Sequence, residues 1–150
     1  MKGSLLNREV LRPSGPGPER AAAAFDGDSE AIGRARALVA AFLERVRERH
    51  GEARPGVGGM AQLVVSELVT NACKYAPGPC LLDLAADVAA GELVMSVWDS
   101  GTVLPAILPP DATRIGRHGL EIVAALSTSL EIRREPVGKR VTIRMPLADA

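Results

Sequence analysis

Glu67 and Asn71 stand four residues apart in the segment SELVTNACKYA. If this segment is helical, the two side chains lie on one face, one turn apart, with Lys74 on nearly the same side. The apolar stripe of that helix needs neither a carboxylate nor an amide, which makes the pair a candidate for chemistry. Taken alone, however, such a pair is more often found on a solvated helix face.

Asp99 ends an apolar segment and is followed two residues later by Gly101, in the sequence VWDSG. A carboxylate at the end of a buried strand can accept a hydrogen bond from a buried ligand, and a glycine lets the backbone approach that ligand closely. Asp-Ser-Gly is also favoured in turns that end strands, and alone this pattern is more typical of such a turn.

Gly116 and Gly119 bracket Arg117 and His118 where a long irregular stretch meets the next apolar helical pattern. Free N–H groups at a helix N-terminus, the helix dipole and an arginine together favour phosphate binding. The alternative is a helix start that only needs a flexible entry. His118 could act as a general base, but no serine or cysteine is placed to form a recognisable triad with it.

Hydrophobic spacing predicts the elements that position these residues. Helices are expected at residues 30–50, 60–75 and 119–126. Strands are expected at residues 21–25, 80–88, 92–98, 129–134 and 140–145. This order predicts an α+β fold, a two-layer sandwich with helices on one face of a mostly antiparallel sheet. The proline- and glycine-rich residues 1–20 are expected to form a flexible leader, and residues 21–150 a single domain.

Composition excludes several classes of protein. The 18 basic and 18 acidic residues balance, which argues against a nucleic-acid binder held by its overall charge. The aromatic content of 3% leaves few platforms on which bases could stack. We see no apolar run that would span a bilayer and no signal peptide, so a cytoplasmic protein with no membrane partner is expected. Cys73 and Cys80 are then expected to be reduced and not to bind a metal.

The three polar patterns occur in a fixed order, separated by a strand pair and a loop. In that order they resemble the N, G1 and G2 boxes of the GHKL ATPase superfamily. This superfamily includes gyrase, heat-shock protein ninety, histidine-kinase catalytic domains and the bacterial anti-sigma-factor serine kinases. The segments ELVTNACKYA, VWDSG, GRHGLEIVAALS and GKRVTIRMP are most similar to the last subgroup, and in particular to short ATP-binding regulatory proteins of actinobacteria. The resemblance covers residues 21–147 and implies a sandwich of the Bergerat type.

The resemblance also implies a role for each matching residue. Asp99 would accept a hydrogen bond from the adenine amino group, with Gly101 shaping the pocket, and Asn71 would bind Mg²⁺ beside the phosphates. Glu67 would be the general base toward the attacking hydroxyl. Residues 102–115 would form the ATP lid. The phosphates would be contacted by Lys74, Gly116, Arg117, His118, Gly119 and Leu120. For Lys74, a solvated lysine is the alternative.

Two places depart from the family pattern. Val103 stands where many members have the second glycine of the G1 box, which bears on lid hinging and on nucleotide affinity. Lys139 and Arg140 follow the last glycine turn, where a threonine usually stands next to the glycine. The contact that this threonine makes with the adenine pocket is therefore expected either to be missing or to come from Thr142.

The resemblance implies an ATP-binding regulatory protein with ATP and Mg²⁺ as cofactors. The first expectation is an anti-sigma factor with serine/threonine protein kinase activity, which binds a sigma factor and phosphorylates a small STAS-type antagonist. The alternative is a non-catalytic, ATP-dependent partner-binding module, and a degenerate fold without nucleotide is the third. Glu67 favours the kinase, whereas Val103 favours the module. Members of this subgroup are often homodimers, and an edge strand at residues 21–25 could pair between subunits.

Overall fold

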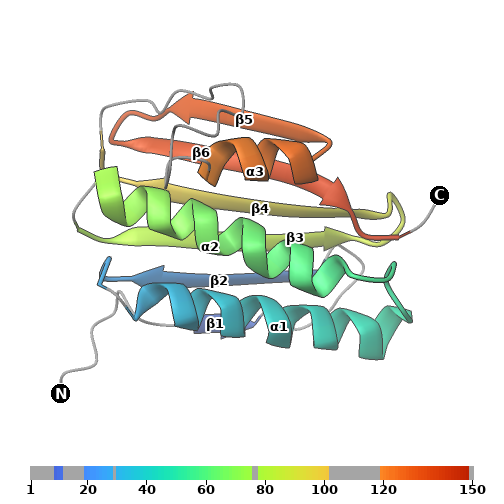
Figure 1. Cartoon of the computed structure of the whole chain (residues 1–150). Coiled ribbons are helices and arrows are strands. Elements are labelled where there is room, and N and C mark those ends of the chain that lie inside the picture. Colours follow the sequence, from blue (N-terminus) through green and yellow to red (C-terminus); the bar gives the residue numbers. More distant parts are fainter. Residues whose placement is uncertain (1–8, 12–18, 29, 76–77, 102–118, 149–150) are drawn as a thin grey trace, which may run out of the picture.

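The computed structural model describes residues 9–11, 19–28, 30–75, 78–101 and 119–148. They form one antiparallel sheet of six strands in the order β1-β2-β3-β4-β6-β5, with the three helices on one face of it (Figure 1). The elements are β1 (Glu9–Leu11), β2 (Glu19–Phe25), α1 (Ala31–His50), α2 (Val57–Tyr75), β3 (Cys80–Asp87), β4 (Glu92–Asp99), α3 (Gly119–Leu126), β5 (Ser129–Arg134) and β6 (Lys139–Pro146). The predicted α+β sandwich is confirmed.

The core lies between the sheet and the helices, because each element turns one apolar face to this layer. On β3 the side chains of Cys80, Leu82, Leu84 and Ala86 are buried, while those between them are exposed or half-buried. This period of two is that of a sheet covered on one face. The matching helical period buries the following side chains of α1: Ala31, Ala35, Leu38, Val39, Phe42 and Val46.

The start of α2 differs from the prediction. The helix begins at Val57, three residues before the expected start at residue 60. Gly56 takes a positive φ of 80°, which turns the chain before the helix, and Val57 is buried in the core. The buried Val57 side chain thus anchors the first turn of the helix, in which Gly58 and Gly59 follow.

The N-terminal edge of the sheet also differs from the prediction. β1 pairs through Glu9–Leu11 with Ala21–Ala23 of β2, whose other edge pairs with β3. The prediction of a flexible leader over residues 1–20 is therefore wrong for β1 and for the first two residues of β2. The rest of that stretch lies outside the described residues. The prediction that β2 is an edge strand free to pair between subunits is likewise wrong at Ala21–Ala23, because β1 already pairs there.

Within the described ranges, no helix combines the length and the apolar character that crossing a bilayer requires. The longest, α1, carries charged residues along its outer face, including Arg47, which pairs with Glu44 and Glu52.

Candidate functional site

Four chain segments that the sequence analysis singled out end or begin at the same end of the sandwich. Figure 1 shows that the C-terminal ends of α2 and β4 lie there, together with the start of β6 and the N-terminal end of α3. Register agrees with this picture, since Asp99 at the end of β4 pairs with Lys139 at the start of β6. We take this end of the molecule as the candidate site.

Asp99 is the last residue of β4, and its carboxylate points into the layer below the helices. Strand alternation places it on the same face as Met95 and Val97, and only 3% of its surface is exposed. Its neighbours in the sheet are Cys80 on β3 and Lys139 on β6. The predicted position of this carboxylate, at the end of a buried strand, is confirmed.

A buried ion pair joins Asp99 to Lys139. The Nζ atom of Lys139 donates a hydrogen bond of 2.7 Å to Oδ1 of Asp99, and Lys139 is only 1% exposed. The backbone N–H of Gly101 donates to the same oxygen at 2.8 Å. A buried charge requires a partner of opposite sign, and each of these two residues supplies it to the other.

Lys139 was noted in the sequence only as a departure from threonine, and its place in the site was missed. The signal was present in the strand pattern: Lys139 stands two residues before Val141 and four before Ile143, both of which are buried. Period two puts all three side chains on the helix-covered face. A lysine at the first position of such a run must be buried with a partner, and the register supplies Asp99.

The turn between β5 and β6 holds the Asp99 backbone in place. Gly138 has a φ of +79°, and a Cβ added there would overlap the carbonyl oxygen of Asp99 and lie 2.9 Å from Cα of Ser100. From the other side of the sheet, Nε1 of Trp98 donates a 2.8 Å hydrogen bond to the carbonyl oxygen of Val137. The turn thus packs against the end of β4 so closely that only a glycine fits.

Gly138→Ala should destabilise the fold by at least about 2 kcal/mol, because it adds backbone strain at positive φ to a direct overlap with Asp99. Urea denaturation measures the change. The matched control is Gly33→Ala in α1, where a Cβ meets nothing within 4 Å. That variant should be neutral or stabilised by up to about 1 kcal/mol. Equal stability of Gly138→Ala and the native chain would contradict this packing.

The helix that carries Glu67 and Asn71 is confirmed. Both side chains are half-buried and lie one turn apart, and each directly precedes a buried residue, Leu68 or Ala72. The Oδ1 atom of Asn71 is buried and has no hydrogen-bond partner among the described residues. A buried carbonyl oxygen without a partner costs free energy, so this atom is suited to a ligand such as a metal ion. Lys74 is exposed in the last turn of the same helix.

Only part of the predicted phosphate site falls within the described residues. Gly119 begins α3, as predicted, and the side chain of Leu120 is 5% exposed, so this residue can face a phosphate only through its backbone. The helix dipole of α3 has its positive end here. Gly116, Arg117 and His118 lie outside the described residues, as does the whole of the lid predicted at 102–115, including Val103.

Thr142 is not brought together with Asp99. It stands three residues after Lys139 on β6, and an odd spacing along a strand puts it on the opposite face of the sheet. There its register partners are Ser96 of β4 and Glu131 of β5. The residue that faces Asp99 on β6 is Lys139, so the structure does not support a contact of Thr142 with the same pocket.

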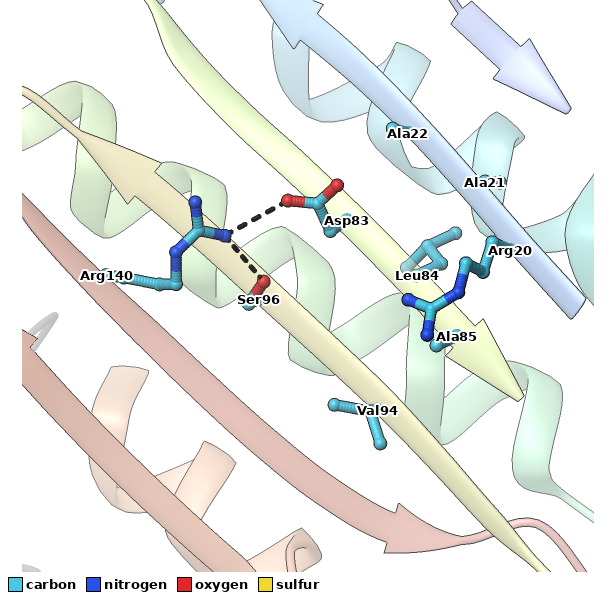
Figure 2. A pocket seen from close by; sticks show the side chains of 9 residues that line it. All are labelled: Arg20, Ala21, Ala22, Asp83, Leu84, Ala85, Val94, Ser96 and Arg140. Atoms are coloured by element: carbon cyan, nitrogen blue, oxygen red, sulfur yellow. Dashed lines mark hydrogen bonds and ion pairs between the residues drawn. The ribbon is translucent and has the colours of Figure 1, made fainter. Parts of the chain in front are cut away.

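The uncovered face of the sheet carries a separate polar hollow of about 360 Å³ (Figure 2). The guanidinium of Arg140 donates through Nη1 to Oδ2 of Asp83 and to Oγ of Ser96, both at 3.0 Å. Arg20 lines the same hollow from β2. Because this hollow lies on the face away from the helices, it is not part of the site around Asp99.

The two cysteines lie near the site as free thiols. Burial raises the pKa of the Cys80 thiol to about 12, with smaller increases from the negative charges of Cys73 and Asp99. Burial also raises the pKa of Cys73, and Asp28 adds to the increase. Both thiols stay protonated at neutral pH, whereas the thiolate is the form that binds metals. Within the described ranges, no group of three or more His, Cys, Asp or Glu side chains could hold a metal ion.

Comparison with known proteins identifies the type of domain. The family described as the histidine kinase-like ATPase domain matches residues 25–145. A search of curated proteins gives no match. Among solved structures, the chain is similar to the RsbU and RsbW domains of Rv1364c from Mycobacterium tuberculosis. The TM-score is 0.64 and the identity 20%, and the match covers 85% of this chain and 32% of that one.

A histidine kinase domain also aligns with the chain. It comes from the blue-light activated histidine kinase of Erythrobacter litoralis EL346, at 24% identity over 75% of this chain and 60% of that one. Its TM-score is 0.45. At these identities the first similarity shows the fold alone, and this chain spans 32% of the length of the Mycobacterium structure.

Proposed function

Because this chain belongs to the histidine kinase-like ATPase domain family, we propose that it binds ATP and Mg²⁺ at the end of the sandwich described above. One observation carries the proposal: two side-chain oxygens there, one on the buried Asp99 and one on the half-buried Asn71, have unused capacity to bind. Among the described residues, Oδ2 of Asp99 receives no hydrogen bond, since Lys139 and Gly101 both donate to Oδ1. Oδ1 of Asn71 has no partner in the same part of the chain.

Each oxygen suits a different part of the nucleotide. The second carboxylate oxygen of Asp99 would accept a hydrogen bond from the exocyclic amino group of adenine, beside Gly101. The amide oxygen of Asn71 is a hard, neutral ligand of the kind that Mg²⁺ takes together with phosphate oxygens and waters. Bound Mg²⁺ would neutralise charge on the phosphates. The N-terminal end of α3 would face the phosphates, with Lys74, Gly116, Arg117, His118, Gly119 and Leu120 as the proposed phosphate contacts.

For the reaction, we propose phosphotransfer to a protein hydroxyl, with Glu67 as the general base. Glu67 lies one turn before Asn71 on α2, so a hydroxyl near the metal-bound phosphates would be within reach of its carboxylate. The sequence resemblance to the anti-sigma-factor serine kinases supports a STAS-type antagonist as the substrate and a sigma factor as the second partner. The fold similarity to a structure containing an RsbW domain is consistent with this choice.

A non-catalytic, ATP-dependent binding module is the second candidate. Val103 favours it, because it stands where the second glycine of the G1 box is found in many chains that resemble this one.

The two candidates differ in one experiment. The full chain is incubated with Mg²⁺, γ-³²P-labelled ATP and purified STAS-domain proteins, and the label is located by mass spectrometry. The kinase predicts label on a serine or threonine of one STAS protein, and none when the chain is omitted. Binding of ATP without transfer to any STAS protein would reject the kinase and leave the binding module.

Asn71→Ala should remove the part of ATP affinity that depends on Mg²⁺. The native chain should bind ATP more tightly in Mg²⁺ than in EDTA, and the variant should lose that difference, a change of roughly tenfold. Calorimetric titration in the two buffers measures it. Gln62→Ala is the matched control on the same helix, since its side-chain amide donates to the carbonyl oxygen of Arg36 on α1. An Mg²⁺ effect that survives in Asn71→Ala would contradict the assignment.

A further inference from the structure

We propose that Lys139 takes part in recognising the nucleotide base: its ammonium donates a hydrogen bond to N1 of adenine while Asp99 accepts one from the exocyclic amino group. The inference rests on the proposed ATP site. It assigns a role to the buried lysine with which β6 begins.

The ion pair between Lys139 and Asp99 leaves one oxygen of the carboxylate available to accept a hydrogen bond from a ligand. Lys139 and Asp99 are direct register partners on the helix-covered face of β6 and β4. Oδ1 of Asp99 accepts from Nζ of Lys139 at 2.7 Å and from the N–H of Gly101 at 2.8 Å. Those two bonds use the lone pairs of Oδ1, so any further donor must go to Oδ2.

The ammonium of Lys139 has unused hydrogen-bond donors, just as the carboxylate of Asp99 has an unused acceptor. It carries three hydrogens, and Asp99 takes one of them; among the described residues nothing accepts the other two. Lys139 is 1% exposed, so bulk water reaches it poorly, and a buried ammonium with unused donors favours an additional acceptor. The pair therefore offers an acceptor and a charged donor side by side.

Adenine has the complementary arrangement on one edge. Its amino group at position 6 is a donor, and the adjacent ring nitrogen N1 is an acceptor. Hydrogen bonds from a charged donor are stronger than neutral ones, so an ammonium would discriminate between bases more sharply than a neutral donor. Guanine reverses both positions, with a carbonyl at position 6 and an N–H at position 1, and would place its carbonyl oxygen against the carboxylate.

Asp99 cannot easily move to accommodate guanine, whose donor and acceptor positions are exchanged relative to adenine. Its backbone carbonyl lies against the turn at Gly138, where even one added methyl group would overlap it. Its side chain is held by the N–H of Gly101. A rigid site that hydrogen-bonds one polar pattern strongly rejects a ligand that lacks it, because its buried groups are then left unpaired.

The test compares ATP with 1-deaza-ATP, in which a C–H replaces N1 and the amino group is kept. Calorimetric titration of the native chain in Mg²⁺ should give a Kd for 1-deaza-ATP roughly tenfold or more above that for ATP. In Lys139→Met the ratio of the two values should fall to near one. Arg144→Met is the control on the same strand: Arg144 is exposed and bonds Glu92, and its loss should leave the ratio unchanged.

The outcomes separate this inference from the proposed function. Equal affinity of the native chain for ATP and 1-deaza-ATP would overturn the role of Lys139 and leave the ATP site standing, and this comparison needs no variant to fold. An unchanged ratio in folded Lys139→Met would overturn it as well. If the native chain binds neither nucleotide, the proposed function fails and the inference fails with it.

Discussion

Glu67→Gln is expected to lower phosphotransfer by roughly 10²–10⁴-fold while leaving ATP affinity unchanged. The amide keeps the size of the side chain but cannot take a proton from the attacking hydroxyl. Glu67 is half-buried on α2, one turn from Asn71, and in the proposed arrangement it touches the acceptor rather than the nucleotide. The measurement is the initial rate of label transfer to the STAS protein that the native chain phosphorylates, with the Kd for ATP determined in parallel.

Glu48→Gln is the matched control for this prediction. Glu48 is exposed on α1, and the same change of a carboxylate to an amide there should alter neither the rate nor the affinity. A fully active Glu67→Gln chain would remove Glu67 as the base. A chain that loses ATP affinity along with activity would instead place Glu67 among the nucleotide-binding groups.

Asp99→Asn is expected to have two large effects at once. It removes the negative charge beside Lys139 and leaves a buried ammonium without its counter-charge, which should destabilise the fold by about 3 kcal/mol. It also replaces a charged acceptor by a neutral amide where the adenine amino group would bind, which should weaken ATP binding roughly tenfold to a hundredfold. Urea denaturation and calorimetric titration measure the two effects separately.

A double variant separates the effect of Asp99 on the stability of the fold from its effect on ATP binding. Asp99→Asn combined with Lys139→Met removes both charges, and replacing a whole buried pair is often close to neutral, so most of the stability should return. ATP binding should stay weak, because neither polar group is restored. If the double variant regains both stability and affinity, Asp99 stabilises the fold without contacting the base.

Most of the fold could be predicted from the sequence, because one covered face imposes its period on every long element. The buried positions of α1 recur at helical spacing, and those of β3 alternate strictly. β1 escaped prediction since a strand of three residues has too few positions to show a period. Its pairing with β2 then changed which strand lies at the edge of the sheet.

Only those site residues that stand in short local sequence patterns could be predicted. Glu67, Asn71 and Asp99 stand in short patterns whose chemistry is visible in the chain itself. The partnership of Asp99 with Lys139 depends on strand register across 40 residues, which no local pattern contains. Thr142 was misplaced for the same reason: a shift of one residue in a strand moves a side chain to the other face.

The central claim is that this chain binds ATP at the buried carboxylate of Asp99, and a calorimetric titration of the native chain with ATP in Mg²⁺ tests it most directly. Saturable binding to a single site is expected for the native chain, and the double variant Asp99→Asn with Lys139→Met should remain folded while binding ATP roughly tenfold to a hundredfold more weakly. A native chain that is folded by circular dichroism and shows no saturable binding of ATP would contradict it.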